Sequence, residues 1–98
     1  MANIKFEYLY RDEDNSKTFG EIVFSNPNQL SLGSITRTIE LSLTEGTWFD
    51  PDKWKIPRFS FHQHNPFGIY DCLWYEFEQV SLTNAACTSR SIEDLLKR

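Results

Sequence analysis

Hydrophobic and polar positions alternate in two stretches near the N-terminus. In residues 4–11, IKFEYLYR, one face of an extended strand carries the apolar and aromatic side chains of Ile4, Phe6, Tyr8 and Tyr10. The opposite face carries Lys5, Glu7, Leu9 and Arg11. Residues 18–25, TFGEIVFS, are rich in β-branched and aromatic residues, which favour a strand. Joined by the polar run 12–17, the two stretches predict a hairpin in which Gly20 marks a bulge or a close approach.

The hydrophobic period becomes helical after Asn26-Pro27-Asn28. Proline lacks an amide donor and disfavours helical geometry in the residue before it, so this tripeptide ends the strand. Apolar residues then recur at helical spacing, namely Leu32, Ile35, Ile39 and Leu43. Ser31 is the expected N-cap, and the helix should end near Glu45 with Gly46 as its stop signal.

Proline and aromatic residues are concentrated in residues 47–70, TWFDPDKWKIPRFSFHQHNPFGIY. Prolines oppose regular structure, so residues 46–57 predict an ordered loop held by its aromatic side chains. Residues 58–64, RFSFHQH, predict a third strand, and the residues NPFG at 65–68 have the chemistry of a type I turn. A fourth strand is expected from about Ile69 to Leu82, with Glu76, Glu78 and Val80 on one face.

The C-terminal residues RSIEDLL predict a second, short helix. Ser91 and Asp94 resemble a capping box, and Ile92, Leu95 and Leu96 would dock the helix on the sheet. The elements then follow the order ββαββα. The sequence thus predicts an α+β fold with an antiparallel sheet of about four strands and two helices. A chain of 98 residues with 40% hydrophobic content is expected to form a single domain over residues 1–98.

The charge balance is acidic and narrows the possible partners. Ten basic and fourteen acidic side chains give a formal net charge of −4, which argues against general binding to nucleic acid or to anionic membranes. Cys72 and Cys87 lack CxxC spacing, and we expect buried, reduced thiols rather than a disulfide. We find no signal-peptide pattern and no run near the roughly 20 apolar residues of a membrane span. We therefore expect a cytoplasmic protein.

Several segments together resemble a group of small bacterial hypothetical proteins without an assigned activity. The segments are YLYRDEDNSKTFGEIVFSNPNQLSL, FDPDKWKIP, WYEFE and RSIEDLL, which cover most of the chain. The resemblance implies a single small cytoplasmic domain and carries over no catalytic residue. A histidine often stands in that group where this chain has Tyr75, which weakens any hypothesis based on imidazole chemistry.

His62 and His64 are the candidate metal ligands. Two residues apart on a strand, they would project to one face and could offer two nitrogens to zinc or another divalent ion. The pair alone is a weak signal, and two surface or partly buried histidines beside a turn explain it more simply. Glu76 and Glu78 share a strand face, but they fit the solvent side of an edge strand better than acid–base catalysis. We expect no catalytic residue and no cofactor.

Residues 53–64 suggest an alternative, a single-stranded nucleic-acid-binding module. The basic residues of this stretch and its two histidines alternate with Trp54, Phe59 and Phe61, and single-strand binders use such residues for phosphates and base stacking. Phe59 and Phe61 would lie on the face opposite His62, however, and are expected to fill the core. The negative net charge is also unfavourable, so nucleic acid is the weaker hypothesis.

The remaining interpretation is a non-enzymatic protein-interaction or regulatory accessory domain, which binds a protein partner or forms a homodimer. Interfaces are commonly anchored by Trp, Tyr and Arg. The candidate contact residues are Trp48, Trp54, Arg58, His62, His64, Phe67 and Tyr70. At least one of the two tryptophans should belong to the core instead, because a domain of this size needs large residues inside.

Overall fold

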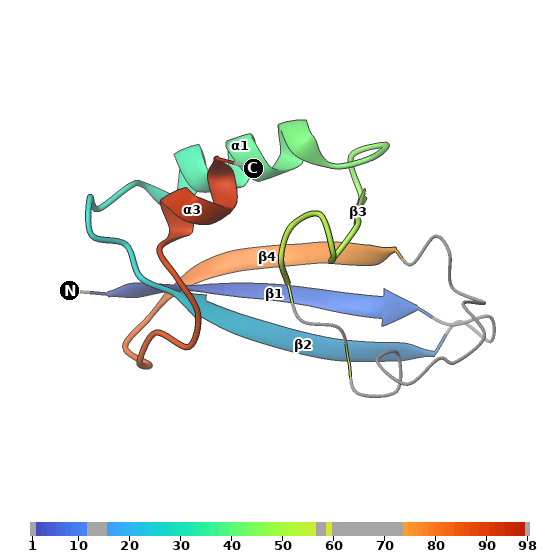
Figure 1. Cartoon of the computed structure of the whole chain (residues 1–98), viewed down its shortest axis with the longest axis horizontal. Coiled ribbons are helices and arrows are strands. Elements are labelled where there is room, and N and C mark those ends of the chain that lie inside the picture. Colours follow the sequence, from blue (N-terminus) through green and yellow to red (C-terminus); the bar gives the residue numbers. More distant parts are fainter. Residues whose placement is uncertain (1, 12–15, 57–58, 60–73, 98) are drawn as a thin grey trace.

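Four antiparallel strands form one sheet, and two helices lie on one of its faces (Figure 1). The computed structural model describes residues 2–11, 16–56, 59 and 74–97. In chain order the elements are β1 (Asn3–Arg11), β2 (Lys17–Phe24), α1 (Leu32–Ser42), β3 (Trp48–Phe49), β4 (Tyr75–Thr83) and α3 (Ile92–Leu96). The order across the sheet is β2-β1-β4-β3. The α+β class with four antiparallel strands and two helices is therefore confirmed.

The hairpin of β1 and β2 forms as the alternation predicts. Ile4 is opposite Phe24, Phe6 is opposite Ile22, and the apolar face of β1 is buried under the helices. Gly20 lies opposite Tyr8 in the register. A methyl group on Gly20 would lie 2.8 Å from Cζ of Tyr8. Of the two interpretations of this glycine, the close approach is the one that the structure confirms.

The bulge is on β4, where the sequence predicted strict alternation. Glu7 is opposite Gln79 and Tyr8 is opposite Phe77, so Glu78 is an extra residue on β4. One inserted residue exchanges the two faces of the strand beyond it. Phe77 and Val80 consequently both pack against the core. The prediction that Val80 shares a face with Glu76 and Glu78 is wrong for this reason.

The third strand is not the predicted one. Residues 46–57 were expected to form a loop throughout, but Trp48 and Phe49 pair with Glu76 and Tyr75 of β4 as strand β3. Most of the expected strand 58–64 and the start of the expected fourth strand lie outside the described residues. The third strand of the described residues is therefore Trp48–Phe49 and not 58–64. In this respect the order of elements differs from the predicted ββαββα. A strand of two residues has too few positions to show a period.

Helix α1 has the predicted start and an earlier end. The side chain of Ser31 accepts a hydrogen bond from the amide of Ser34, as an N-cap does. The helix stops at Ser42 rather than near Glu45, because Thr44 pairs with Trp48 instead. The amide of Thr44 donates to the Trp48 carbonyl over 2.7 Å, and the chain turns toward β3.

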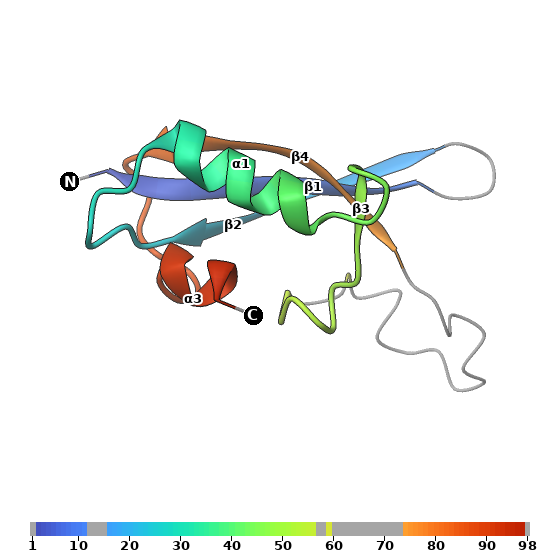
Figure 2. The same cartoon turned by 90° about the horizontal axis from the view of Figure 1, so that it is seen from above.

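The C-terminal segment attaches to the outer edge of β2. The amide of Thr88 donates to the Val23 carbonyl over 2.9 Å, and the amide of Ile92 donates to the Ser25 carbonyl over 2.8 Å. Helix α3 follows, with Ser91 as its N-cap, as predicted. Viewed from above, α3 lies beside α1 (Figure 2). Among the described helices, none is long and apolar enough to cross a membrane.

One cysteine differs from expectation. Cys87 was expected to be buried, but it is exposed and forms no disulfide. It lies in the polar connection between β4 and α3, where its sulfur can donate weakly to the Arg90 carbonyl over 3.7 Å. This connection runs along the sheet edge rather than through the core, which explains the exposure. Cys72 lies outside the described residues.

Candidate interaction surface

The face of the sheet opposite the helices carries a row of residues that crosses all four strands. The register places Phe19 of β2 opposite Leu9 of β1, Leu9 opposite Glu76 of β4, and Glu76 opposite Trp48 of β3. Neighbouring residues on these strands, such as Tyr8, Tyr75 and Phe49, point into the core. Because side chains alternate along a strand, the row points away from the helices. Leu9, in the middle of the row, is only 4% exposed, so the exposed apolar side chains are Phe19 and Trp48 at its two ends.

An ion pair between Arg11 and Glu76 joins β1 to β4 on this face. Nε of Arg11 donates to Oε2 of Glu76 over 2.9 Å, and Nη2 donates to Oε1 over 3.4 Å. This hydrogen bonding raises the pKa of the Arg11 guanidinium above its ordinary value. Such a two-pronged contact fixes both side chains in one orientation.

Two exposed tryptophans lie near Glu76, one opposite it in the sheet and one two residues before it in the chain. Trp48 is opposite Glu76 and is 38% exposed, and Trp74, which directly precedes β4, is 41% exposed. We call Arg11, Trp48, Trp74 and Glu76 together the aromatic face. Tryptophan and arginine are the residue types most enriched where binding energy is concentrated in protein interfaces. The arrangement can offer a partner two large apolar surfaces around a charge pair of fixed geometry.

The predicted contact residues are distributed differently from expectation. Trp48 lies on the surface, as a contact residue must. Trp54 is only 5% exposed, because its ring stacks on Phe49 with a centroid distance of 4.8 Å. Trp54 therefore belongs to the core, as expected for at least one tryptophan, and a partner cannot reach it in this fold. The other candidates lie outside the described residues, namely Arg58, His62, His64, Phe67 and Tyr70.

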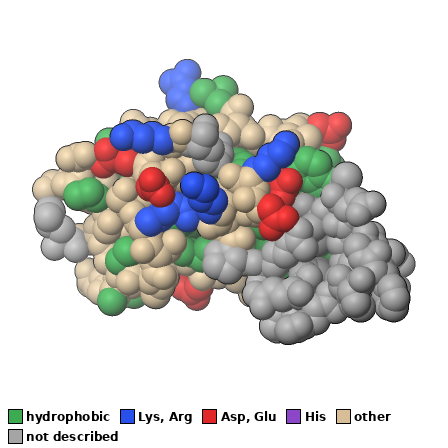
Figure 3. Space-filling model, viewed as in Figure 1, with side chains coloured by type: hydrophobic (Ala, Val, Ile, Leu, Met, Phe, Trp, Pro, Cys, Tyr) green, Lys and Arg blue, Asp and Glu red, His purple; other side chains and the backbone are tan. Residues whose placement is uncertain are grey.

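The described part of residues 53–64 lacks an exposed stacking surface. Trp54 is buried, and the ring of Phe59 packs against those of Tyr8 and Tyr75 with centroid distances of 5.5 and 5.1 Å. On the face shown in Figure 3, Lys and Arg side chains are interspersed with Asp and Glu. A single-stranded nucleic acid needs exposed rings beside a continuous basic track. Where residues are described, this geometry does not support the nucleic-acid hypothesis.

The metal hypothesis rests on His62 and His64, which lie outside the described residues. Within the described ranges, no group of three or more His, Cys, Asp or Glu side chains could hold a metal ion.

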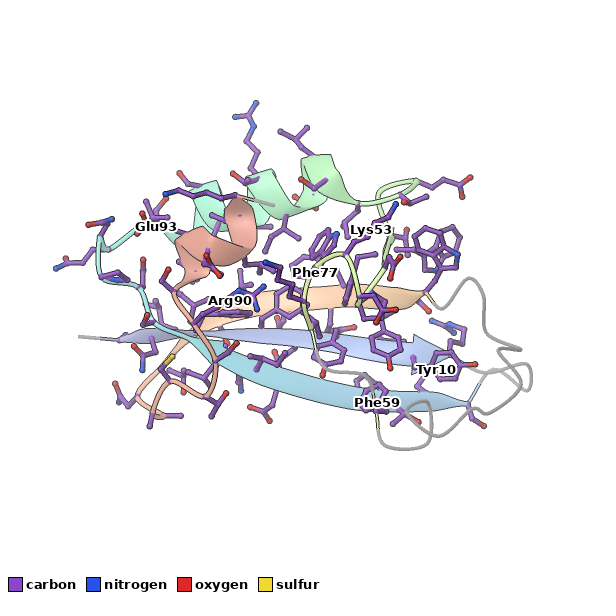
Figure 4. The ribbon with its side chains drawn as sticks, viewed as in Figure 1. Tyr10, Lys53, Phe59, Phe77, Arg90 and Glu93 are labelled. Atoms are coloured by element: carbon purple, nitrogen blue, oxygen red, sulfur yellow. The ribbon has the colours of Figure 1, made fainter. Side chains whose placement is uncertain are left out.

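Arg90 is the main structural residue that the sequence did not reveal. Its Nη1 donates to the Lys55 carbonyl over 2.9 Å, and its Nη2 donates to the Trp54 carbonyl over 2.7 Å. Its Nε lies 2.8 Å from Oδ2 of Asp94, and its guanidinium lies over the Phe24 ring. Figure 4 shows Arg90 below α3, between this helix and the loop that carries Lys53. The residue fastens this loop to the C-terminal segment and thereby holds Trp54 in the core.

The sequence did not predict that the four residues of the aromatic face lie together, although it predicted the strand faces on which some of them lie. Alternation placed Arg11 on the polar face of the first strand, and it placed Trp74 and Glu76 together on the last. The missing information was that these two strands are neighbours, which depends on the order across the sheet.

The chain matches no family model, no curated protein and no solved structure. The resemblance to small bacterial hypothetical proteins therefore stays a prediction.

Proposed function

We propose that this chain is a non-enzymatic protein-interaction domain that binds a protein partner on its aromatic face. The observation that carries the proposal is the exposure of Trp48 and Trp74 at one end of the sheet. Burying apolar surface against a partner stabilises a complex by about 25 cal/mol per Å². Two half-exposed tryptophans offer a large part of the apolar area that a small interface core needs.

The ion pair supports the proposal because it organises the surface before binding. Arg11 and Glu76 are held against each other, and Trp48 is anchored by the pairing of β3 with β4. Side chains that are already ordered lose less entropy when a partner docks. The aromatic face therefore combines apolar area with a small cost of ordering.

The wider role that we propose is that of a regulatory accessory domain in the cytoplasm. The resemblance to small bacterial proteins is part of this proposal, as is the expectation of reduced cysteines. The exposed, unbridged Cys87 is compatible with a reducing compartment.

The test is affinity capture from native cells with matched variants. The wild-type chain should enrich a protein partner, and the double variant Trp48→Ala/Trp74→Ala should lose it. Leu41→Ala is the control, because Leu41 is 80% exposed on α1, which covers the other face of the sheet. With the captured protein purified, calorimetry should show at least about 30-fold weaker binding for each single tryptophan variant.

Urea unfolding distinguishes a lost contact from a lost fold. Both tryptophan variants should keep the cooperative unfolding of the wild type, since these side chains lie outside the core cluster. Absence of any enriched protein would refute the proposal, and so would equal capture by the wild type and the double variant.

A further inference from the structure

Among the described residues, the backbone of β2 from Lys17 to Glu21 has no strand partner on its outer side. Val23 exchanges hydrogen bonds with Thr88, so the backbone groups of Val23 point away from β1. Backbone direction alternates along a strand, and Lys17, Phe19 and Glu21 therefore point their amides and carbonyls the same way. No other strand of the described residues pairs with this edge. Phe19 at its midpoint is 63% exposed.

The charges on this edge face like charges inside the sheet. Lys17 is opposite Arg11, and Glu21 is opposite Glu7. Like charges directly opposite each other on neighbouring strands are destabilising. The ion pairs that the structure shows here join Arg11 to Glu76 and Lys5 to Glu7. Lys17 and Glu21 thus face a like charge on the β1 side, and in the described part of the chain no strand lies on their other side.

We propose that a second copy of this chain pairs with this edge, antiparallel, about a two-fold axis at Phe19. Phe19 then faces Phe19 of the second copy, Lys17 faces its Glu21, and Glu21 faces its Lys17. Residues that face each other with outward backbone groups exchange both hydrogen bonds. The two sheets merge into one of eight strands, and each edge charge gains an opposite partner.

The position of the two-fold axis follows from the charges of Lys17 and Glu21 and from the C-terminal segment, which already bonds to Val23. An axis at Glu21 would place two glutamates opposite each other and would need Val23, which Thr88 already occupies. An axis at Lys17 would place two lysines opposite each other. An axis at Thr18 or at Gly20 would leave Lys17 and Glu21 without opposite partners. Of these axes, only the one at Phe19 gives both charges an opposite partner and uses no backbone position that a described residue already occupies.

This dimer uses the edge of β2 and does not depend on a partner for the aromatic face. Its test is sedimentation equilibrium of the full chain between about 1 µM and about 1 mM, because an interface of one short strand pair is expected to be weak. The wild type should shift from monomer to dimer over this range. Lys17→Glu and Glu21→Lys should each raise the dimer dissociation constant at least about tenfold, since each creates two like-charge pairs across the axis.

Mixing the two variants provides the sharpest result. A Lys17→Glu chain and a Glu21→Lys chain place opposite charges at both positions of a mixed dimer, so the mixture should associate again with near wild-type strength. Arg37→Glu and Glu40→Lys change the net charge equally on the exposed side of α1 and are the matched controls. These controls should dimerise like the wild type, alone and mixed.

The same substitutions separate dimer loss from unfolding. Inside its own sheet, Lys17→Glu faces Arg11 and Glu21→Lys faces Glu7, so each change should leave the monomer equally or more stable to urea. A wild type that stays monomeric throughout would overturn the proposal. Single variants that dimerise unchanged, or a mixture that does not recover association, would also overturn it.

Discussion

Replacing Gly20 with alanine tests the close packing between β2 and the aromatic core. The added methyl group would lie 2.8 and 2.9 Å from two ring atoms of Tyr8, and 2.9 Å from Cε1 of Phe59. Ordinary van der Waals contacts begin at 3.4 Å. The Tyr8 ring would therefore have to move by about half an ångström, since carbon atoms settle near 3.5–4.0 Å.

The surrounding rings leave Tyr8 little room for that movement. Its ring stacks on Tyr75 with a centroid distance of 5.6 Å, and it also contacts Phe6 and Phe49 at 5.9 and 6.1 Å. Overpacking of this kind costs about 1–3 kcal/mol. Alanine recovers about 0.5–1 kcal/mol through the reduced freedom of the unfolded chain. We expect a net destabilisation of about 1–2 kcal/mol.

The assay is urea unfolding of Gly20→Ala beside Gly33→Ala. Gly33 lies in α1, and a methyl group there would meet no atom within 4 Å. The control should therefore gain up to about 1 kcal/mol of stability. For a domain of this size, the loss at Gly20 corresponds to a melting temperature lower by about 4–16 °C. A Gly20→Ala variant as stable as the wild type would refute the packing argument.

Three further substitutions test other contacts by the free energy of unfolding. Arg90→Lys should lose about 1–3 kcal/mol, because one ammonium cannot replace both fixed hydrogen bonds to the Trp54 and Lys55 carbonyls; an unchanged value would contradict the clamp. Asn26→Asp should lose a similar amount at neutral pH, since the carboxylate keeps the hydrogen bond from the Leu30 amide but cannot donate to its carbonyl. Burial raises the pKa of Tyr8, so its neutral phenol contributes stability that is complete below about pH 10 and is lost as the pH rises through the higher folded-state pKa. Tyr8→Phe should flatten the fall in stability above that pH, and an unaltered alkaline slope would contradict this assignment.

The sequence correctly predicted the features that depend on residues close together in the chain, such as the helix caps. Ser31 and Ser91 cap their helices because each hydroxyl accepts from an amide three residues later, a signal that the sequence alone contains. Alternation in β1 predicted the buried side chains of Ile4, Phe6 and Tyr8 for the same reason, but it placed Leu9 on the polar face, and Leu9 is buried too. These features need no knowledge of neighbouring strands.

The features that sequence reasoning missed depend on distant pairing. The bulge at Glu78 exists only relative to the register of β4 with β1, and strand β3 is too short for a period. Arg11 and Glu76 are 65 residues apart, so their ion pair required the strand order. Arg90 binds two backbone carbonyls, which any sequence could supply, and no pattern in the sequence identifies such an acceptor.

The two proposals together predict how binding strength depends on partner valency. In the proposed dimer the strand order runs from β3 of one copy to β3 of the other, so the two Trp48 residues lie about 30–35 Å apart on the same face of the sheet. A partner displayed densely on a surface can engage both, and such avidity exceeds a single contact by about 10²–10⁴-fold. Lys17→Glu should therefore weaken binding to the dense surface while leaving binding to a dilute, monomeric partner unchanged. Trp48→Ala should weaken both, because it removes the contact itself. If Lys17→Glu weakened the monomeric partner as strongly as Trp48→Ala does, the edge of β2 would belong to the partner's binding site rather than to a dimer.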